Sequence, residues 1–192
     1  MIFENEGREN TAKTVELAVK TAKERGIKEL VIATSTGGTP PYLDNYDLEG
    51  IHVTIVTTAY GYGGPGKNRL PEEKRAEFIA KGYDVVTAAH ALTGVERSLG
   101  TPANDAPGTV IAATLKLISR GTKVCVEIAA MACDAGCIAP GEEIIAVAGS
   151  GGGADTAIIM RPANTHKLFD TRLDEFICKP KAALVTTPPE KK

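Results

Sequence analysis

The sequence predicts an α/β domain with a mainly parallel β-sheet. Segments in which apolar residues recur at helical spacing alternate with short runs rich in β-branched residues. Glycine or proline stands at many of the boundaries between these segments. Parallel strands need a crossover connection, usually a helix, so this alternation favours a sheet with helices packed on it. At 192 residues the chain suits one domain, expected at 1–180, followed by a flexible tail at 181–192.

The first half of the chain contains the clearest elements. A helix is expected from Asn10, which can cap its start, to Gly26, where a left-handed backbone is tolerated. Pro71 begins a second helix, which has acidic residues in its first turn and Gly82 at its end. Short β-branched runs predict strands at 29–34, 51–58 and 83–89, and the turn after the first of them is expected to open a helix near Pro40 or Pro41.

The second half contains a long connection and one ambiguous segment. The connection at 90–108 is of a length that is often functional. A helix is expected at 109–121, capped around Asp105 and closed by Gly121. The segment 123–136 begins with the alternation of a strand, but its length and its alanines favour a buried helix. Two further strands are expected on either side of a glycine cluster, at 142–149 and 154–162.

Composition and charge exclude several classes of protein. The chain is 43% hydrophobic and 24% charged, as is ordinary for a globular protein, and its net charge of −2 leaves no electrostatic footprint for nucleic acid or an anionic membrane. The apolar runs are too short to span a membrane and the N-terminus lacks a signal-peptide pattern, so a cytoplasmic location is expected. The four cysteines lack the neighbouring ligand pair of a zinc site, so buried, reduced thiols and no metal are expected.

The predicted sheet indicates where a ligand would bind, because ligands of α/β sheets bind beyond the carboxyl ends of the strands. The turn T-S-T-G-G-T follows the first predicted strand and combines hydroxyl donors, backbone amides and an expected helix N-terminus. Such a turn favours phosphate, and an ordinary capped turn is the alternative interpretation. The turns expected at this edge of the sheet are Thr34–Thr39, Thr58–Lys67, His90–Asn104 and Gly149–Thr156.

The glycine cluster G-S-G-G-G at residue 149 raises the question of a nucleotide loop. Gly149, Gly151 and Ala154 fit the dinucleotide fingerprint letter by letter, but that fingerprint requires a helix after the glycines. Here the apolar run Ile158–Met160 predicts a strand, which Pro162 ends. A Walker loop is excluded because no Gly-Lys-Ser/Thr follows. The remaining interpretations are a plain hairpin connection and a backbone cradle that approaches a mononucleotide.

Several motifs together resemble a known family. The stretch ELVIATSTGGTPPYL, followed later by GCIAPGEEIIAVAGSGGGADTAIIMRP, resembles the C-terminal domain of pyruvate kinase. GRENT, ERS, KVCVEI, GADTAIIMRP and FICKP are similar to free-standing proteins of this type from archaea and bacteria, over residues 1–180. The resemblance implies a three-layer α/β/α sandwich without pyruvate kinase activity, since that enzyme's catalytic barrel is absent from this sequence.

The resemblance also implies a ligand. In pyruvate kinase the turn that matches Thr34–Thr39 holds a sugar phosphate, whereas the free-standing proteins are associated with flavin mononucleotide (FMN). The loop GYGGPGKNRL and the extension FICKP depart from pyruvate kinase, so the sugar phosphate cannot simply be carried over. We therefore expect binding of a phosphorylated mononucleotide, with FMN as the suspected cofactor. A phosphometabolite sensor that does not bind flavin is the alternative.

The residues allow more than one role for several side chains. Tyr60 and Tyr62 could stack on a flavin ring or pack on the surface. Glu127, among small apolar neighbours, must bind a ligand's ring nitrogens or ribityl hydroxyls, or pair with Arg8 or Arg97. The full set of cofactor-binding candidates is Thr34, Ser35, Thr36, Gly37, Gly38, Thr39, Tyr60, Gly61, Tyr62, Glu127, Gly149, Ser150, Gly151, Gly152, Asp155 and Thr156.

Catalysis and assembly are less constrained by the sequence. Asp155 and Thr156 either bond a ribityl chain or close a turn, and His90 is a weak candidate for acid–base chemistry. No catalytic constellation stands out, so the reaction, if any, stays open. The apolar segment EFICKP could pair with a sheet edge in its own or a neighbouring subunit, so a homodimer is expected.

Overall fold

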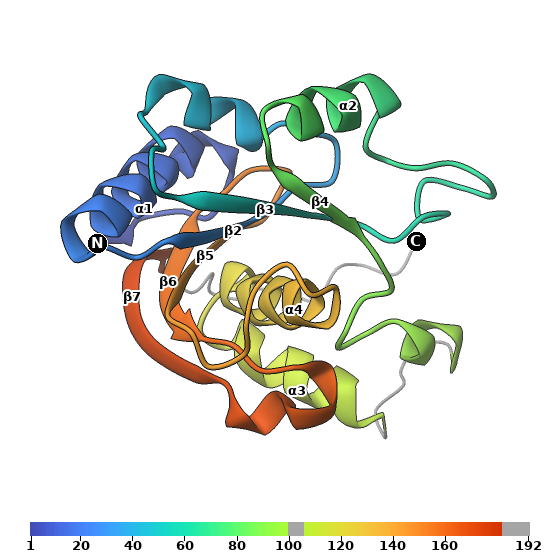
Figure 1. Ribbon diagram of the computed structural model, residues 1–192. Helices are drawn as coiled ribbons and strands as arrows, with labels where there is room; N and C mark the ends of the chain where they lie inside the picture. The colour runs from blue at the N-terminus through green and yellow to red at the C-terminus, as the bar shows by residue number, and fades with distance from the viewer. Residues whose placement is uncertain (100–105, 182–192) are drawn as a thin grey trace.

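A mixed sheet of seven strands forms the middle of the computed structural model, which describes residues 1–99 and 106–181 (Figure 1). The strand order is β1-β7-β6-β5-β2-β3-β4. Four pairings are parallel, β1–β7, β5–β2, β2–β3 and β3–β4, whereas β6 runs antiparallel to both of its neighbours. The strands are β1 (Ile2–Phe3), β2 (Glu29–Ala33), β3 (His52–Thr57), β4 (Asp84–Thr87), β5 (Ile144–Ala148), β6 (Thr156–Arg161) and β7 (Arg172–Pro180).

Helices cover both faces of this sheet, so the expected three-layer α/β/α architecture is confirmed. Figure 1 shows α1 (Thr11–Arg25) and α2 (Glu72–Ala80) on one face, and α3 (Pro107–Lys116) and α4 (Arg120–Asp134) on the other. None of the helices in the described part of the chain has the length and apolar character needed to cross a membrane. Short 3₁₀ segments complete the fold: η1 (Arg8–Asn10), η2 (Pro40–Asn45), η3 (Val95–Leu99) and η4 (Thr165–Asp170).

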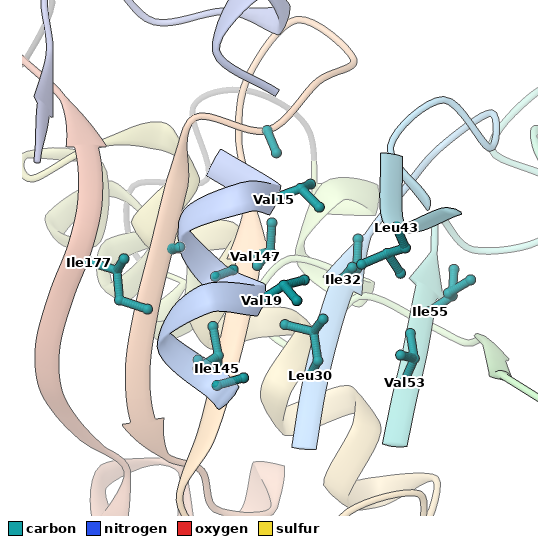
Figure 2. Close-up of a cluster of buried hydrophobic side chains, with 14 of the residues drawn as sticks. Val15, Val19, Leu30, Ile32, Leu43, Val53, Ile55, Ile145, Val147 and Ile177 are labelled. Carbon is teal, nitrogen blue, oxygen red and sulfur yellow. The ribbon is translucent and has the colours of Figure 1, made fainter. Parts of the chain in front are cut away.

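The central strands are buried on both faces, and their alternating side chains divide the core in two. Leu30 and Ile32 of β2 face α1, whereas Val31 belongs to the cluster that contains the apolar face of α4. This two-sided burial explains why the strands read as continuous apolar runs. Figure 2 shows the α1 side of the core, where Val15 and Val19 lie over the side chains of the strands, including Leu30, Ile32, Ile145 and Val147.

Most predicted elements are present, but one helix boundary was wrong. Gly26 ends α1 in the expected left-handed conformation (φ 69°), and the ambiguous segment is helical, as α4. The helix expected at 109–121 stops at Lys116, and a new helix starts at Arg120, capped by the Ser119 hydroxyl, which accepts from the Thr122 amide at 2.9 Å. Gly121 therefore lies in the first turn of a helix and does not close one.

Of the two predicted N-caps, that at Asn10 is wrong and that at Asp105 lies outside the described residues. Asn10 precedes α1, but its side chain does not cap the helix; its Nδ2 donates to the carbonyl of Asn5 at 2.9 Å. Asp105, expected to cap the next helix, and Asn104 lie outside the described residues. The described α3 begins instead behind Ala106, with Pro107 at its first position, which suits proline because the first amide of a helix has no intrahelical acceptor.

The apolar segment EFICKP lies inside the sheet of its own chain. It forms most of β7, which pairs antiparallel with β6 and, near its end, parallel with β1. The segment thus finds its partners within one subunit, and the reason for expecting it to bridge two subunits no longer holds. A homodimer stays a prediction that would need a different surface.

His52 links the amino ends of three parallel strands. Its Nδ1 lies 2.7 Å from a carboxylate oxygen of Glu29, at the start of β2, and its Nε2 lies 3.1 Å from one of Asp84, at the start of β4. Burial lowers the pKa of His52, but the hydrogen bonds and negative charges of Glu29 and Asp84 outweigh burial, so its pKa is raised above the ordinary value. The imidazolium thereby connects β2, β3 and β4.

This linkage predicts a pH-dependent contribution to stability. Because folding raises the pKa of His52, its contribution is fully present below the unfolded-state value of about 6.5 and is lost as the pH rises through the folded-state pKa. The His52 side chain is 38% exposed. Solvent screening therefore limits the contribution to about 0.2–1 kcal/mol. Urea unfolding of the wild type and of His52→Gln should show a stability difference that shrinks as the pH rises above about 6.5; a difference that grows would contradict the assignment.

Candidate functional site

A cavity of about 240 Å³ opens at the carboxyl ends of β2, β3 and β5. Helix α4 forms one of its walls, and the turns that follow the three strands supply others. This is the edge of the sheet at which the sequence predicts a ligand. The residues around the cavity are Ala33, Thr34, Ser35, Thr39, Val56, Thr57, Thr58, His90, Lys123, Val124, Glu127, Ile128, Met131, Gly149, Gly152 and Gly153.

The turn Thr34–Thr39, which was predicted to bind phosphate, reaches the cavity through some of its residues. Ser35 and Thr39 line the cavity, whereas Thr36 is exposed and does not. The hydroxyl of Thr34 accepts from the amide of Gly37 at 3.0 Å, so it organises the turn. The expected helix after the turn is only the six-residue 3₁₀ segment η2, which lacks the aligned dipoles of a full α-helix. Hydroxyls and backbone amides are therefore what this turn can offer to a phosphate.

The glycine cluster connects the antiparallel strands β5 and β6, so a strand follows it as predicted and the dinucleotide turn is excluded. Gly149 has no room for a side chain, since a Cβ there would lie 2.6 Å from the amide nitrogen of Asp155. Gly151 and Gly152 have left-handed backbones (φ 61° and 81°), so valine at either position would strain the loop as well as fill space. Gly149, Gly152 and Gly153 reach the cavity, and Gly151 and Ser150 do not line it.

Asp155 and Thr156 are fully buried and hold the hairpin together. The carboxylate of Asp155 accepts from the amide of Gly7 at 3.1 Å, the hydroxyl of Ser150 at 3.0 Å and the hydroxyl of Thr156 at 2.8 Å. The Thr156 hydroxyl also lies 3.2 Å from that of Ser119. These bonds favour the turn-closing interpretation, and the alternative of a contact to a ribityl chain has no support from the geometry.

The loop that contains Tyr60 and Tyr62 does not line the cavity. Tyr60 is 66% exposed, and its hydroxyl donates to the carbonyl of Gly66 at 2.8 Å. The ring of Tyr62 stacks on His90 with a centroid distance of 5.2 Å, and the Arg69 guanidinium lies 5.1 Å from the Tyr62 ring centre. Because the Tyr62 ring already contacts His90 and Arg69, its position does not support the interpretation that it stacks on a flavin ring. Gly61, in the same loop, is exposed.

Glu127 lines the cavity, and its ion-pair partner was not predicted from the sequence. It forms a buried ion pair with Lys123, one helical turn earlier, and accepts from the amide of Leu92 at 3.2 Å. The exposed fractions of the two side chains are 8% for Lys123 and 5% for Glu127. Pairing with Arg8 or Arg97 was one of the two interpretations of Glu127; the side chain of Arg97 is not among those that the structure describes, and no bond between Glu127 and Arg8 is present. The spacing of four residues on an otherwise apolar helix was the available signal for this pair.

His90 is oriented by its neighbours. Its Nε2 accepts from the amide of Ala59 at 3.4 Å, and its Nδ1 lies 3.8 Å from a carboxylate oxygen of Glu127. The acceptor role of Nε2 places the proton of the neutral ring on Nδ1, toward Glu127. His90 thus contacts the loop at Ala59 through a hydrogen bond and faces Glu127 of α4, and its acid–base role stays a weak prediction.

The cysteines show the chemistry of buried thiols. Burial raises the pKa of Cys133 to about 11 and that of Cys125 well above its ordinary value. Both thiols therefore stay protonated and unreactive near neutral pH. Within residues 1–99 and 106–181, no cluster of three His, Cys, Asp or Glu side chains has the arrangement of a metal site.

Comparison with known families agrees with this architecture. The model of the pyruvate kinase alpha/beta domain family matches residues 12–160, most of the chain, including β2, β5, the glycine hairpin and α4. The chain belongs to this family. The pyruvate kinase alpha/beta domain is compatible with binding a small molecule or with a regulatory role, and the cavity lies wholly inside the matched region.

The buried pair predicts a specific pattern of stability changes. Lys123→Met leaves the Glu127 charge buried without its ammonium partner, and removing one member of such a pair costs about 3–5 kcal/mol. In Lys123→Met/Glu127→Gln no charge is left, and the glutamine oxygen can still accept from Leu92, so the loss should be smaller than in the single variant. Denaturant unfolding of the four members of the cycle measures this coupling; additive losses would contradict it.

Proposed function

We propose that the protein binds a phosphorylated mononucleotide, with FMN as the first choice, in the cavity at the carboxyl edge of the sheet. The observation that carries the proposal is the mixed character of the lining. The loops contribute hydroxyls and glycine backbone, whereas the strands and α4 contribute Val56, Val124, Ile128 and Met131. A ligand with a phosphate at one end and an apolar ring at the other matches such a lining.

The residues present fit the two ends of FMN. Ser35 and Thr39 can donate hydroxyl hydrogen bonds to a phosphate, and glycine at position 152 lets a ligand approach the backbone closely. The ring would lie against the apolar side chains of α4, because the tyrosines expected for this purpose lie outside the lining. When bound, FMN supplies electron or hydride transfer, and the protein supplies position and environment.

A second candidate is a sensor of a smaller phosphorylated metabolite. The cavity is smaller than the roughly 300–1,000 Å³ typical of small-molecule sites. His90 is the only aromatic side chain among the described residues that line it. Both observations favour a compact ligand over a large ring system. A colourless protein that binds sugar phosphates and not flavin would establish this second function in place of the first.

Calorimetric titration with FMN, riboflavin and a sugar phosphate tests the proposal. The wild type should bind FMN more tightly than riboflavin, because only FMN carries the phosphate. Ser35→Ala/Thr39→Ala should lose about 2–4 kcal/mol of FMN binding, from two charge-assisted hydrogen bonds, with little change for riboflavin.

Thr36→Ala is the matched control, because Thr36 belongs to the same turn, is exposed and lies outside the lining. It should bind FMN like the wild type. Equal losses of FMN affinity in the control and the double variant would show that the phosphate does not bind on the cavity side of the turn. NAD should not bind, since no helix follows the glycine loop to receive a pyrophosphate.

A further inference from the structure

Two charged side chains of opposite sign are among the described residues that line the cavity. Among the described residues that line it, Lys123 and Glu127 are the charged side chains, and His90 is the other ionisable group. Lys123 is buried near the amino end of α4, where the positive end of the helix dipole disfavours a cation. Its order with Glu127, lysine before glutamate, is also the weaker one for an i,i+4 pair. Local stability therefore does not account for an ammonium at this position.

Glu127 is surrounded by hydrogen-bond donors. One of its oxygens accepts from the amide of Leu92, and the other binds Lys123 and faces His90. The carboxylate therefore holds Lys123 and the 90–93 segment in place and presents little acceptor capacity to a ligand. The ammonium of Lys123, which Glu127 holds in place, lies in the wall of the same cavity that Ser35 and Thr39 line.

We propose that this cavity selects ligands with a single phosphate group, bound between the Ser35–Thr39 turn and the ammonium of Lys123. The inference rests on the proposed function and narrows its ligand class. A second phosphate would find no further cation among the described lining residues, and burying a phosphate without a cation is costly. We therefore expect a second phosphate group to add no affinity.

Inorganic phosphate and pyrophosphate are the direct probes, and they do not depend on flavin. Calorimetry on the full chain should give a dissociation constant for pyrophosphate no tighter than that for phosphate. Lys123→Met should weaken phosphate roughly tenfold or more, the loss of a charge-assisted bond. Lys67→Met, which removes an exposed cation from the neighbouring loop outside the lining, is the control and should leave both constants unchanged.

Lys123→Met/Glu127→Gln decides the question if the single variant does not fold, because it leaves no unpaired charge. This double variant should also have lost the phosphate-dependent part of binding, measured as the ratio of the FMN to the riboflavin dissociation constant. Pyrophosphate binding tighter than phosphate, or an unchanged FMN to riboflavin ratio, would overturn the inference. Phosphate binding that depends on Lys123 in a protein without affinity for FMN would refute the proposed function and leave this inference intact.

Discussion

The carboxylate of Asp155 is the group on which the geometry of the site depends. It is fully buried, and it joins the N-terminal segment, the glycine hairpin and β6 through hydrogen bonds to Gly7, Ser150 and Thr156. The Thr156 hydroxyl continues the network to Ser119, which caps α4. A buried carboxylate requires such partners, because leaving it unsatisfied is costly. The network thus sets the start of α4 relative to the hairpin, and with it the two walls of the cavity.

Glycine makes the close approach of these elements possible. A Cβ on Gly121 would overlap the side chain of Thr156, so the first turn of α4 packs directly onto β6 only because the residue is glycine. A Cβ on Gly153 would likewise overlap Arg8 and Thr11, where the hairpin meets the start of α1. The glycine-rich sequence therefore serves packing at Gly121, Gly149 and Gly153, and open backbone at Gly152, which reaches the cavity.

Polar groups are buried at one end of this sheet at a cost in stability. Lys123 and Glu127 lie in the wall of the cavity, and their mutual attraction has to offset the loss of hydration of both charges. At the opposite end of the sheet, His52 with Glu29 and Asp84 forms a more exposed charged cluster that adds modestly to stability. The two clusters differ in kind: the exposed one joins strands, and the buried one faces a cavity at the edge where α/β proteins bind ligands.

The candidate site was partly predictable. The turn at 34–39 and the glycine hairpin were found because strand ends and glycine clusters are visible in a linear pattern, and Glu127 because a carboxylate among apolar residues is conspicuous. For Tyr60 and Tyr62 both interpretations stayed open, since an aromatic residue in a loop does not reveal which way its ring faces. Lys123 was missed, although its spacing to Glu127 was visible, because a lysine near a helix start is usually solvated.

Sequence alone indicated most of the helices and strands, the strand after the glycine cluster and the edge of the sheet at which a ligand would bind. These follow from local periodicity and from turn residues, which act over a few positions. Only the tertiary structure decided that EFICKP pairs inside its own sheet, that Gly121 lies in the first turn of a helix and that Ser35, Thr39, Lys123 and Glu127 surround one cavity. Each of these depends on contacts between residues far apart in the chain, such as Gly121 with Thr156, which no local pattern encodes.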